Sequence, residues 1–273
     1  MTDHTYLTWL YVPGDRPGVV AKALGSGADV VLVDLEDAVA PDRKGYALDA
    51  TAELLADKHE VPVHVRVNAL DGPLAEREVR RLTPLPGLDA LRLPKVAGPH
   101  DINRVLDWAV EVPPVYALLE SALGIEHAYT IAGHPCVHGI ALGEADLRAE
   151  LGVTDAAGLA WPRGRAVVAA RAAQLPPPPQ SVYPDVRDTE GLARSCAEGR
   201  ALGFLGRTAI HPRQLPVIEA AFLPTEREVA AAREIVRTAA MDAGALALPD
   251  GRFVDAAVVA DARRVLTLTE RRS

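Results

Sequence analysis

Short runs of apolar and β-branched residues alternate along the chain with longer stretches in which apolar residues recur every three or four positions. The first pattern is typical of buried strands and the second of amphipathic helices. Residues 43–57 and 102–110 show the helical pattern, because their apolar side chains fall roughly on one face. Eight strands are predicted, over residues 7–13, 29–37, 61–68, 90–96, 114–121, 137–147, 180–185 and 206–212.

The repeated strand–helix order predicts parallel strands joined by right-handed crossovers. Eight such units in about 220 residues match the size of a (β/α)8 or TIM barrel. The competing fold, an open doubly wound sheet, usually carries a Gly-rich phosphate loop after its first strand. The sequence VPGDRPG at 12–18 lacks the G-x-G-x-x-G spacing of that loop. We therefore expect an α/β fold with a TIM barrel over residues 1–243.

The C-terminal end of the chain departs from this repeat after the eighth predicted helix, at about 225–241. Pro249-Asp250-Gly251 is a turn signal between two short extended runs, which predicts a hairpin, and a last helix follows it. We treat residues 244–273 as a separate hairpin–helix extension. It either caps the barrel or packs on a neighbouring subunit.

Composition narrows the classes of protein that fit. The chain is 49% hydrophobic and 24% charged, which is ordinary for a globular protein, and charges or prolines interrupt every apolar run that could span a membrane. The first residues do not resemble a secretory signal, and two cysteines cannot form a disulfide framework, so we expect a cytoplasmic protein. A net charge of −8 and 4% aromatic residues argue against nucleic acid as a partner.

Polar side chains follow the apolar run at nearly every predicted strand end. Barrel enzymes build their sites from these ends, which all lie on one side of the barrel. Any single residue could be a helix cap or a solvated loop residue, but chance does not collect opposite charges around one rim. The set comprises Asp34, Glu36, Asp37, Arg66, Asn68, Lys95, Glu120, Glu144, Asp146 and His211.

Two of these residues suit a metal ion. Glu120 and Asp146 follow adjacent strands, and paired carboxylates with waters are how proteins usually hold Mg²⁺. Zinc is disfavoured, because the His and Cys residues of segment 134–138 lie in one loop without a second pair of ligands. Arg66 could clamp a substrate carboxylate through two parallel hydrogen bonds. An ion pair of Arg66 with Asp34 or Glu36 is the alternative, and the two roles could coexist.

Nine stretches of the chain resemble, in order, the citrate lyase β-subunit-like proteins of the aldolase and citrate lyase superfamily. The segment DLEDAV with a lysine further on, together with IHPRQ, is the most specific part of this resemblance. The matching stretches are YVPGDRP (11–17), VLVDLEDAVAPDRK (31–44), VHVRVN (63–68), LRLPK (91–95), LLESALG (118–124), LGEADLRAELG (142–152), VYPDVRDTEGL (182–192), GFLGRTAIHPRQL (203–215) and FVDA (253–256).

The resemblance implies a TIM barrel with a Mg²⁺ site on Glu120 and Asp146, in which Mn²⁺ could substitute. It implies that Arg66 binds substrate and takes part in catalysis, and that the substrate is a thioester of coenzyme A or of an acyl carrier protein. It also implies a homotrimer or hexamer in which Asp255 enters the neighbouring subunit's site as the acid or base. Capping of the last helix is the alternative role of Asp255. Further substrate contacts are expected from Glu36, Asp37, Lys44, Lys95 and Ser121, and coenzyme A contacts from His211, Pro212 and Gln214.

The sequence departs from the family pattern at two places. Thr8-Trp9 replaces the usual Arg-Ser before the first strand motif, where the family makes part of its thioester or nucleotide contact. Glu120-Ser121 replaces Glu-Thr and keeps the hydroxyl. The pyruvate-aldolase branch uses an early histidine base, and residues 34–50 contain no histidine.

The predicted function is therefore a Mg²⁺-dependent lyase that cleaves or forms a C–C bond in a β-hydroxyacyl-CoA, giving an oxo acid or ketone and an acyl-CoA. In this scheme Arg66 stabilises the charge that develops on oxygen, and Asp255 protonates the thioester enolate. Three alternatives stay open. They are a citrate lyase β subunit acting on a carrier-bound thioester, a metal-dependent aldolase without coenzyme A, and a non-catalytic barrel that binds acyl-CoA.

Overall fold

The computed structural model describes residues 5–241, 246–247 and 253–269. The chain divides into two compact units, of which the larger is Tyr6–Glu219. The smaller unit comprises Ala220–Ser273 with the first five residues.

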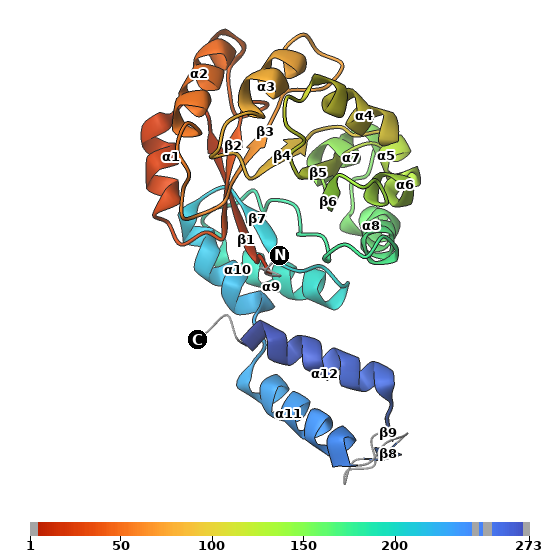
Figure 1. Ribbon diagram of the computed structural model, residues 1–273. Coiled ribbons are helices and arrows are strands. Elements are labelled where there is room, and N and C mark those ends of the chain that lie inside the picture. Colours follow the sequence, from red (N-terminus) through yellow and green to blue (C-terminus); the bar gives the residue numbers. More distant parts are fainter. Residues whose placement is uncertain (1–4, 242–245, 248–252, 270–273) are drawn as a thin grey trace. The chain divides into compact units, whose positions relative to one another are not determined.

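The larger unit is built on one parallel sheet whose strands lie inside a surrounding layer of helices (Figure 1). The strand order is β6-β5-β4-β3-β2-β1-β7, and every pairing in it is parallel. The predicted parallel α/β fold is thus confirmed. The strands are β1 (Thr8–Pro13), β2 (Val30–Asp34), β3 (Val63–Arg66), β4 (Ala90–Leu93), β5 (Val115–Leu119), β6 (Val137–Leu142) and β7 (Arg207–Ala209).

Helices connect successive strands and cover the outer face of the sheet. A short 3₁₀-helix directly precedes each of α2, α8 and α10. These 3₁₀-helices are η1 (Pro41–Arg43), η2 (Ala156–Leu159) and η3 (Pro212–Gln214). The helices are α1 (Pro17–Leu24), α2 (Lys44–Leu54), α3 (Ala75–Leu82), α4 (Pro99–Trp108), α5 (Ala122–Glu126), α6 (Ala128–Ala132), α7 (Glu144–Leu151), α8 (Ala160–Ala172), α9 (Thr189–Ala201) and α10 (Leu215–Phe222).

The central strands are apolar because both faces of the sheet are covered. β2 reads VVLVD and every one of its residues is buried, as expected for a strand between helices and the interior of a curled sheet. Leu32, Leu91 and Leu119, from β2, β4 and β5, have no exposed surface. The core thus rests on aliphatic side chains, in keeping with the low aromatic content.

The predicted closure of the barrel by a strand at 180–185 is wrong, because this segment forms only one bridge, between Gln180 and Arg207 of β7. Gln180 is preceded by four prolines, which have no N–H group to extend a ladder. Toward β6, the hydroxyl of Ser181 takes the place of backbone pairing. It donates a hydrogen bond to the carbonyl of Leu142 and accepts one from the N–H of Glu144. The sheet is therefore an open, curled array of seven strands.

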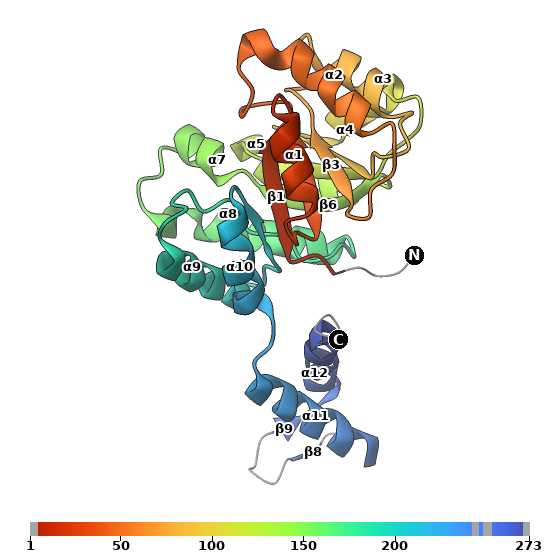
Figure 2. The same ribbon diagram turned by 90° about the vertical axis from the view of Figure 1, so that its left-hand side faces the viewer.

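The smaller unit contains α11 (Glu226–Met241) and α12 (Ala256–Thr269), which pack side by side (Figures 1 and 2). Two short strands, β8 (Leu246–Ala247) and β9 (Phe253–Val254), pair antiparallel between them. The predicted turn at Pro249-Asp250-Gly251 lies outside the described residues. No described helix is long and apolar enough to cross a lipid bilayer.

Candidate functional site

The carboxyl ends of β2, β3, β5 and β6 bring the predicted polar residues to one edge of the sheet. The register pairs Asp34 at the end of β2 with Arg66 at the end of β3. Glu120 follows β5 directly, and Asp146 lies in the first turn of α7, just after β6. Parallel strands point their carboxyl ends the same way, so these residues share one rim.

Arg66 is held in a fixed orientation by carboxylates. Its Nε and Nη2 donate to the two oxygens of Asp34 at 2.7 Å each, which is the bidentate geometry of a strong Arg–carboxylate pair. Its Nη1 lies 3.0 Å from Glu36 Oε2 and 3.5 Å from Asp37 Oδ2. The guanidinium also stacks over the ring of Tyr11, 4.9 Å from its centroid. The ion pair considered as an alternative is therefore present, and a substrate contact of Arg66 stays a prediction.

Glu120 is a buried carboxylate with an unusual proton affinity. Its side chain is 5% exposed, and Oε2 accepts a hydrogen bond from the backbone N–H of Lys95 at 2.9 Å. Burial, followed by the negative charge of Glu36, raises the pKa of Glu120 to about 7, and Asp146 adds to the rise. Gly143 makes room for this side chain, because a Cβ there would overlap the Glu120 carboxylate.

Lys95 adopts a backbone conformation that is rare for a residue with a Cβ. Its φ is +53°, in the left-handed region. This turn lets its N–H reach Glu120 while its ammonium lies 3.1 Å from Glu36 Oε1. Burial raises the pKa of Glu36, although the charge of Arg66 opposes that rise. Strained backbone of this kind persists where the surroundings enforce it, often at functional sites.

Asp146 differs from its neighbours because its side chain is exposed and, within the described part of the chain, receives no hydrogen bond or ion pair. Glu144, two residues earlier, forms a bidentate pair with Arg163 of α8 at 2.7 and 2.6 Å. That pair anchors the first turn of α7. Arg163 was not predicted, since nothing in its sequence surroundings links it to a motif 19 residues away.

The described residues contain no group of three or more His, Cys, Asp or Glu side chains arranged to hold a metal ion. A magnesium site does not require three, because Mg²⁺ usually takes one or two carboxylates and fills its other positions with water and substrate oxygens. Glu120 and Asp146 fit this requirement. Burial and then the charge of Glu36 are the main causes of the raised pKa of Glu120, and the charge of Asp146 adds to it, so a divalent cation held by the two carboxylates would stabilise their charged forms.

Several other predicted contact residues are engaged within the chain. The Ser121 hydroxyl caps α5 by accepting the N–H of Gly124 at 3.1 Å. His211 Nδ1 accepts the N–H of Arg213 at the start of η3. Gln214 is 1% exposed and holds the N–H of Ile210 and the carbonyl of Tyr183 with its amide group. The roles of Ser121, His211, Pro212 and Gln214 toward substrate or coenzyme A stay predictions.

Asp255 lies in the smaller unit, where it caps α12. Its Oδ1 accepts the N–H groups of Ala257 at 2.9 Å and Val258 at 3.0 Å. The capping role considered for this residue is thus present in the structure. The entry of Asp255 into a neighbouring subunit's site stays a prediction.

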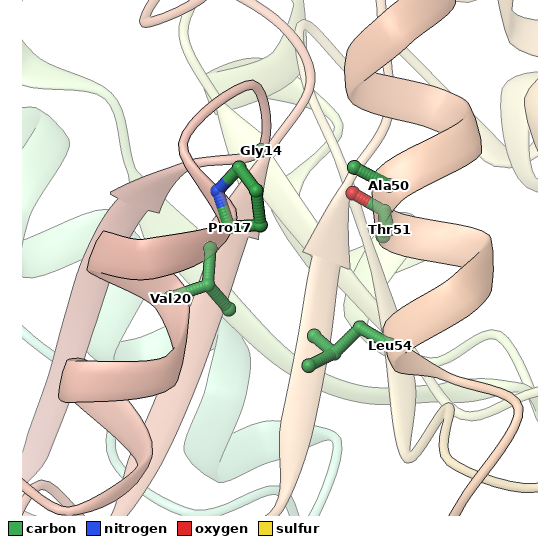
Figure 3. Close-up of a pocket in the computed structure, with 6 residues that line it drawn as sticks. All are labelled: Gly14, Pro17, Val20, Ala50, Thr51 and Leu54. Carbon is green, nitrogen blue, oxygen red and sulfur yellow. The ribbon is translucent and has the colours of Figure 1, made fainter.

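A small cavity of about 20 Å³ lies between α1 and α2 (Figure 3), and Gly14 in its wall donates its N–H to the carbonyl of Asp34 at 2.8 Å. That volume is room for about one water molecule. Gly14 and Thr51 face each other across it, and Thr51 Oγ1 is buried without a hydrogen-bond partner. None of the predicted site residues lines this cavity, whose wall consists of Gly14, Pro17, Val20, Ala50, Thr51 and Leu54.

Comparison with known proteins places the chain among enzymes. The family model described as HpcH/HpaI aldolase/citrate lyase matches residues 7–212. A (3S)-malyl-CoA thioesterase of Cereibacter sphaeroides is 34% identical over 98% of this chain and 95% of its own length. An L-malyl-CoA/beta-methylmalyl-CoA lyase of the same species is 33% identical over 96% of this chain and 93% of its own length.

Among solved structures, the protein CitE of Mycobacterium tuberculosis in complex with magnesium, acetoacetate and coenzyme A superposes with a TM-score of 0.83. It is 31% identical, and the match covers 97% of this chain and 98% of that one. The resemblance inferred from the sequence motifs is therefore confirmed by independent comparisons of sequence and of fold.

Proposed function

Because the chain belongs to the HpcH/HpaI aldolase/citrate lyase family, we propose that it is a Mg²⁺-dependent carbon–carbon lyase acting on a β-hydroxyacyl-CoA thioester. Cleavage gives an oxo acid or ketone and an acyl-CoA, and the reverse reaction is a condensation. The similarity to a malyl-CoA lyase and to a CitE structure with magnesium and coenzyme A supports this proposal.

One structural observation carries the proposal: Arg66, Glu120 and Asp146 lie at the carboxyl ends of strands of a single parallel sheet. The site combines two oxygen ligands for a hard cation with a rigid guanidinium. These are the parts that a reaction through an enolate requires, because negative charge must be stabilised on oxygen as the C–C bond breaks.

Glu120 and Asp146 would hold the ion, and bound Mg²⁺ supplies Lewis-acid polarisation and a template for the oxo-acid oxygens. Asp34 prevents Arg66 from turning away, so the guanidinium keeps its orientation while charge develops at the substrate. The Lys95 side chain stays 46% exposed beside Glu36, so its ammonium can also meet a substrate carboxylate at this part of the rim. An Asp255 contributed by a neighbouring copy would move the proton at the thioester's α-carbon in a site shielded from water.

Thioester hydrolysis is a second candidate, because the thioesterase named above aligns with nearly the whole chain. The two reactions differ in their products. Cleavage of the C–C bond yields an acyl-CoA and an oxo acid, whereas hydrolysis yields free coenzyme A and the intact hydroxy acid. The same carboxylates and arginine could serve both reactions, so the products decide between them.

The test is to incubate the chain and Mg²⁺ with a panel of β-hydroxyacyl-CoA esters and to identify the products by mass. An acyl-CoA with an oxo acid supports the lyase, and free coenzyme A with the intact hydroxy acid supports the hydrolase. Parallel reactions with free hydroxy-oxo acids, and with thioesters on an acyl carrier protein, test the other two branches. Loss of turnover in EDTA and in Glu120→Ala is expected, and full activity in EDTA would exclude the metal role.

We further propose that the chain works in the cytoplasm as a homotrimer or hexamer. The family resemblance and the expected Asp255 contribution from a neighbour support the assembly. Light scattering of the full chain measures its mass directly. Removal of 244–273 should weaken assembly and stop catalysis together, and a fully active monomer would exclude a shared site.

A further inference from the structure

A buried carboxylate on α3 lies behind the candidate site and has no part in the function proposed above. Glu78 is 2% exposed, although burial of a charged group without compensation is costly. Burial raises the pKa of its carboxyl, while hydrogen bonds from Asn68 act in the opposite direction. Its oxygens accept the backbone N–H of Asn68 at 2.8 Å and the side-chain Nδ2 of Asn68 at 2.5 Å.

Glu78 fixes the orientation of the Asn68 side-chain amide, and this orientation in turn decides which atom faces Lys44. Nδ2 faces two acceptors, Glu78 and the carbonyl of Leu35 at 2.8 Å. Oδ1 therefore faces the ammonium of Lys44, from which it accepts a hydrogen bond at 2.7 Å. A flipped amide would point its NH₂ group at the ammonium and its oxygen at two acceptors.

Lys44 uses all three of its N–H bonds within the chain. Besides Asn68 they go to the carbonyls of Leu35 at 2.7 Å and of Glu36 at 2.6 Å. An ammonium has three donors, so all three are engaged within the chain, and the substrate contact expected of Lys44 stays a prediction. In the structure Lys44 clamps the backbone just after β2, at the residue that carries a rim carboxylate.

Glu36 links this clamp to the site. Its carboxylate lies beside Lys95 and Arg66, and its charge is the second cause, after burial, of the raised pKa of Glu120. A shift of the backbone at residue 36 would therefore change what surrounds Arg66 and Glu120. Sub-ångström placement of such groups strongly affects catalysis.

We infer that Glu78 is a positioning residue of this enzyme, which holds Glu36 in place through Asn68 and Lys44. The catalytic consequence rests on the proposed function, but the relay itself does not. Its chemistry requires a carboxylate at position 78, because both partners there are N–H donors. A glutamine offers only one acceptor, and its NH₂ group would turn the Asn68 amide and direct Nδ2 at the Lys44 ammonium.

The relay is tested first without any substrate, by competitive acetylation of lysines with acetic anhydride and mass spectrometry. The chain has four lysines, of which Lys22 and Lys58 are exposed internal standards. In the wild type, Lys44 should react about 10-fold or more slowly than these standards, because its ammonium must first leave three hydrogen bonds. In Glu78→Gln, Lys44 should approach the rate of Lys22 and Lys58, and Lys95 should also react faster as Glu36 moves.

The matched control is Glu76→Gln on the same helix, whose exposed carboxylate pairs, among the described residues, only with Arg80 one turn away. It should change neither the labelling pattern nor turnover. Glu78→Gln should lower kcat/KM by about 10–100-fold, as removal of an outer-shell partner does. A loss caused by general destabilisation would instead lower the Tm and leave Lys44 protected at temperatures well below it.

Lys44→Met provides the second variant should Glu78→Gln fail to fold, since Lys44 lies at the partly exposed edge of the relay. It should raise the labelling of Lys95 and lower kcat/KM by a similar factor, and the double variant should be no worse than either single one. Three outcomes would overturn the inference. They are continued protection of Lys44 in Glu78→Gln, unchanged labelling of Lys95 in Lys44→Met, and a loss of kcat/KM in the double variant equal to the sum of the two single losses in free energy. If no acyl-CoA is turned over, the labelling result still decides the relay separately from the proposed function.

Discussion

Because the backbone of Lys95 is left-handed, substitutions there can separate the effect of backbone strain on stability from the effect of the ammonium on activity. Lys95→Ala removes the ammonium but keeps a Cβ at φ +53°. Lys95→Gly removes the ammonium and the strain together, because glycine has no Cβ to clash in this region. Lys95→Asn keeps a side chain that tolerates the conformation. The three variants share the loss of charge and differ in backbone energy.

The magnitude follows from two opposing effects. A non-glycine residue in the left-handed region costs roughly 1–2 kcal/mol. Glycine in turn costs roughly 0.5–1 kcal/mol, because its unfolded chain is more flexible. Lys95→Gly should therefore exceed Lys95→Ala in unfolding free energy by about 0.5–1 kcal/mol, or about 1–4 °C in Tm for a unit of this size. This order reverses the usual advantage of alanine over glycine.

The assay is thermal unfolding of the three variants at one Mg²⁺ concentration, together with kcat/KM on an accepted acyl-CoA. Both Lys95→Gly and Lys95→Ala should lose most activity, since neither presents an ammonium beside Glu36. A stabilised but inactive glycine variant is the expected outcome. An alanine variant more stable than the glycine variant would refute the strain argument, and wild-type turnover in either would refute the role of the ammonium.

Four further predictions concern single residues. Arg66→Lys should lose much of kcat/KM although the charge is kept, because lysine cannot make the bidentate contact seen with the carboxylate of Asp34; an unchanged value would exclude the clamp. Gly143→Ala should displace Glu120 and cost about 100-fold in kcat with little loss of secondary structure, which circular dichroism checks alongside kinetics. Asp255→Asn should keep the cap of α12 and the Tm of the protein, yet lower the rate about 10²–10⁴-fold. Mixing Asp255→Asn chains with Glu120→Ala chains should restore part of the activity. Wild-type turnover by Asp255→Asn would leave Asp255 only its capping role. Burial and then the charge of Arg92 lower the pKa of His64 from 6.5 to about 3. Below about pH 6.5 the unfolded chain therefore binds a proton that the folded chain does not, and the free energy of unfolding falls by about 1.4 kcal/mol for each pH unit of acidification. In urea unfolding between about pH 5 and about pH 6.5, the free energy of unfolding should depend less steeply on pH in His64→Gln than in the wild type, and an equal slope would contradict this assignment.

The sequence by itself determined the order of the elements and the edge at which the site lies. Seven of the eight predicted strands are present, because a strand buried on both faces must be apolar along its length and that pattern is local. The strand–helix repeat then requires parallel strands, so Arg66 and Glu120 had to lie at the same rim wherever the helices packed. The predicted strand at 180–185, the seventh along the chain, forms only a single bridge, because the four prolines before it have no N–H donors and its own apolar pattern does not show that loss.

Only the tertiary structure decided how the rim residues are used. Nothing local to Lys44 shows that its three donors meet two carbonyls and Asn68, since these partners lie eight to 24 residues away. The raised pKa of Glu120 depends on burial and on Glu36, 84 positions distant in the chain and brought near by the sheet. Glu78 sits in a charged helix whose sequence does not distinguish it from its exposed neighbours. Charge, burial and hydrogen bonding are properties of surroundings that the fold assembles from distant segments, so residue type and spacing locate the site and the packing assigns its roles.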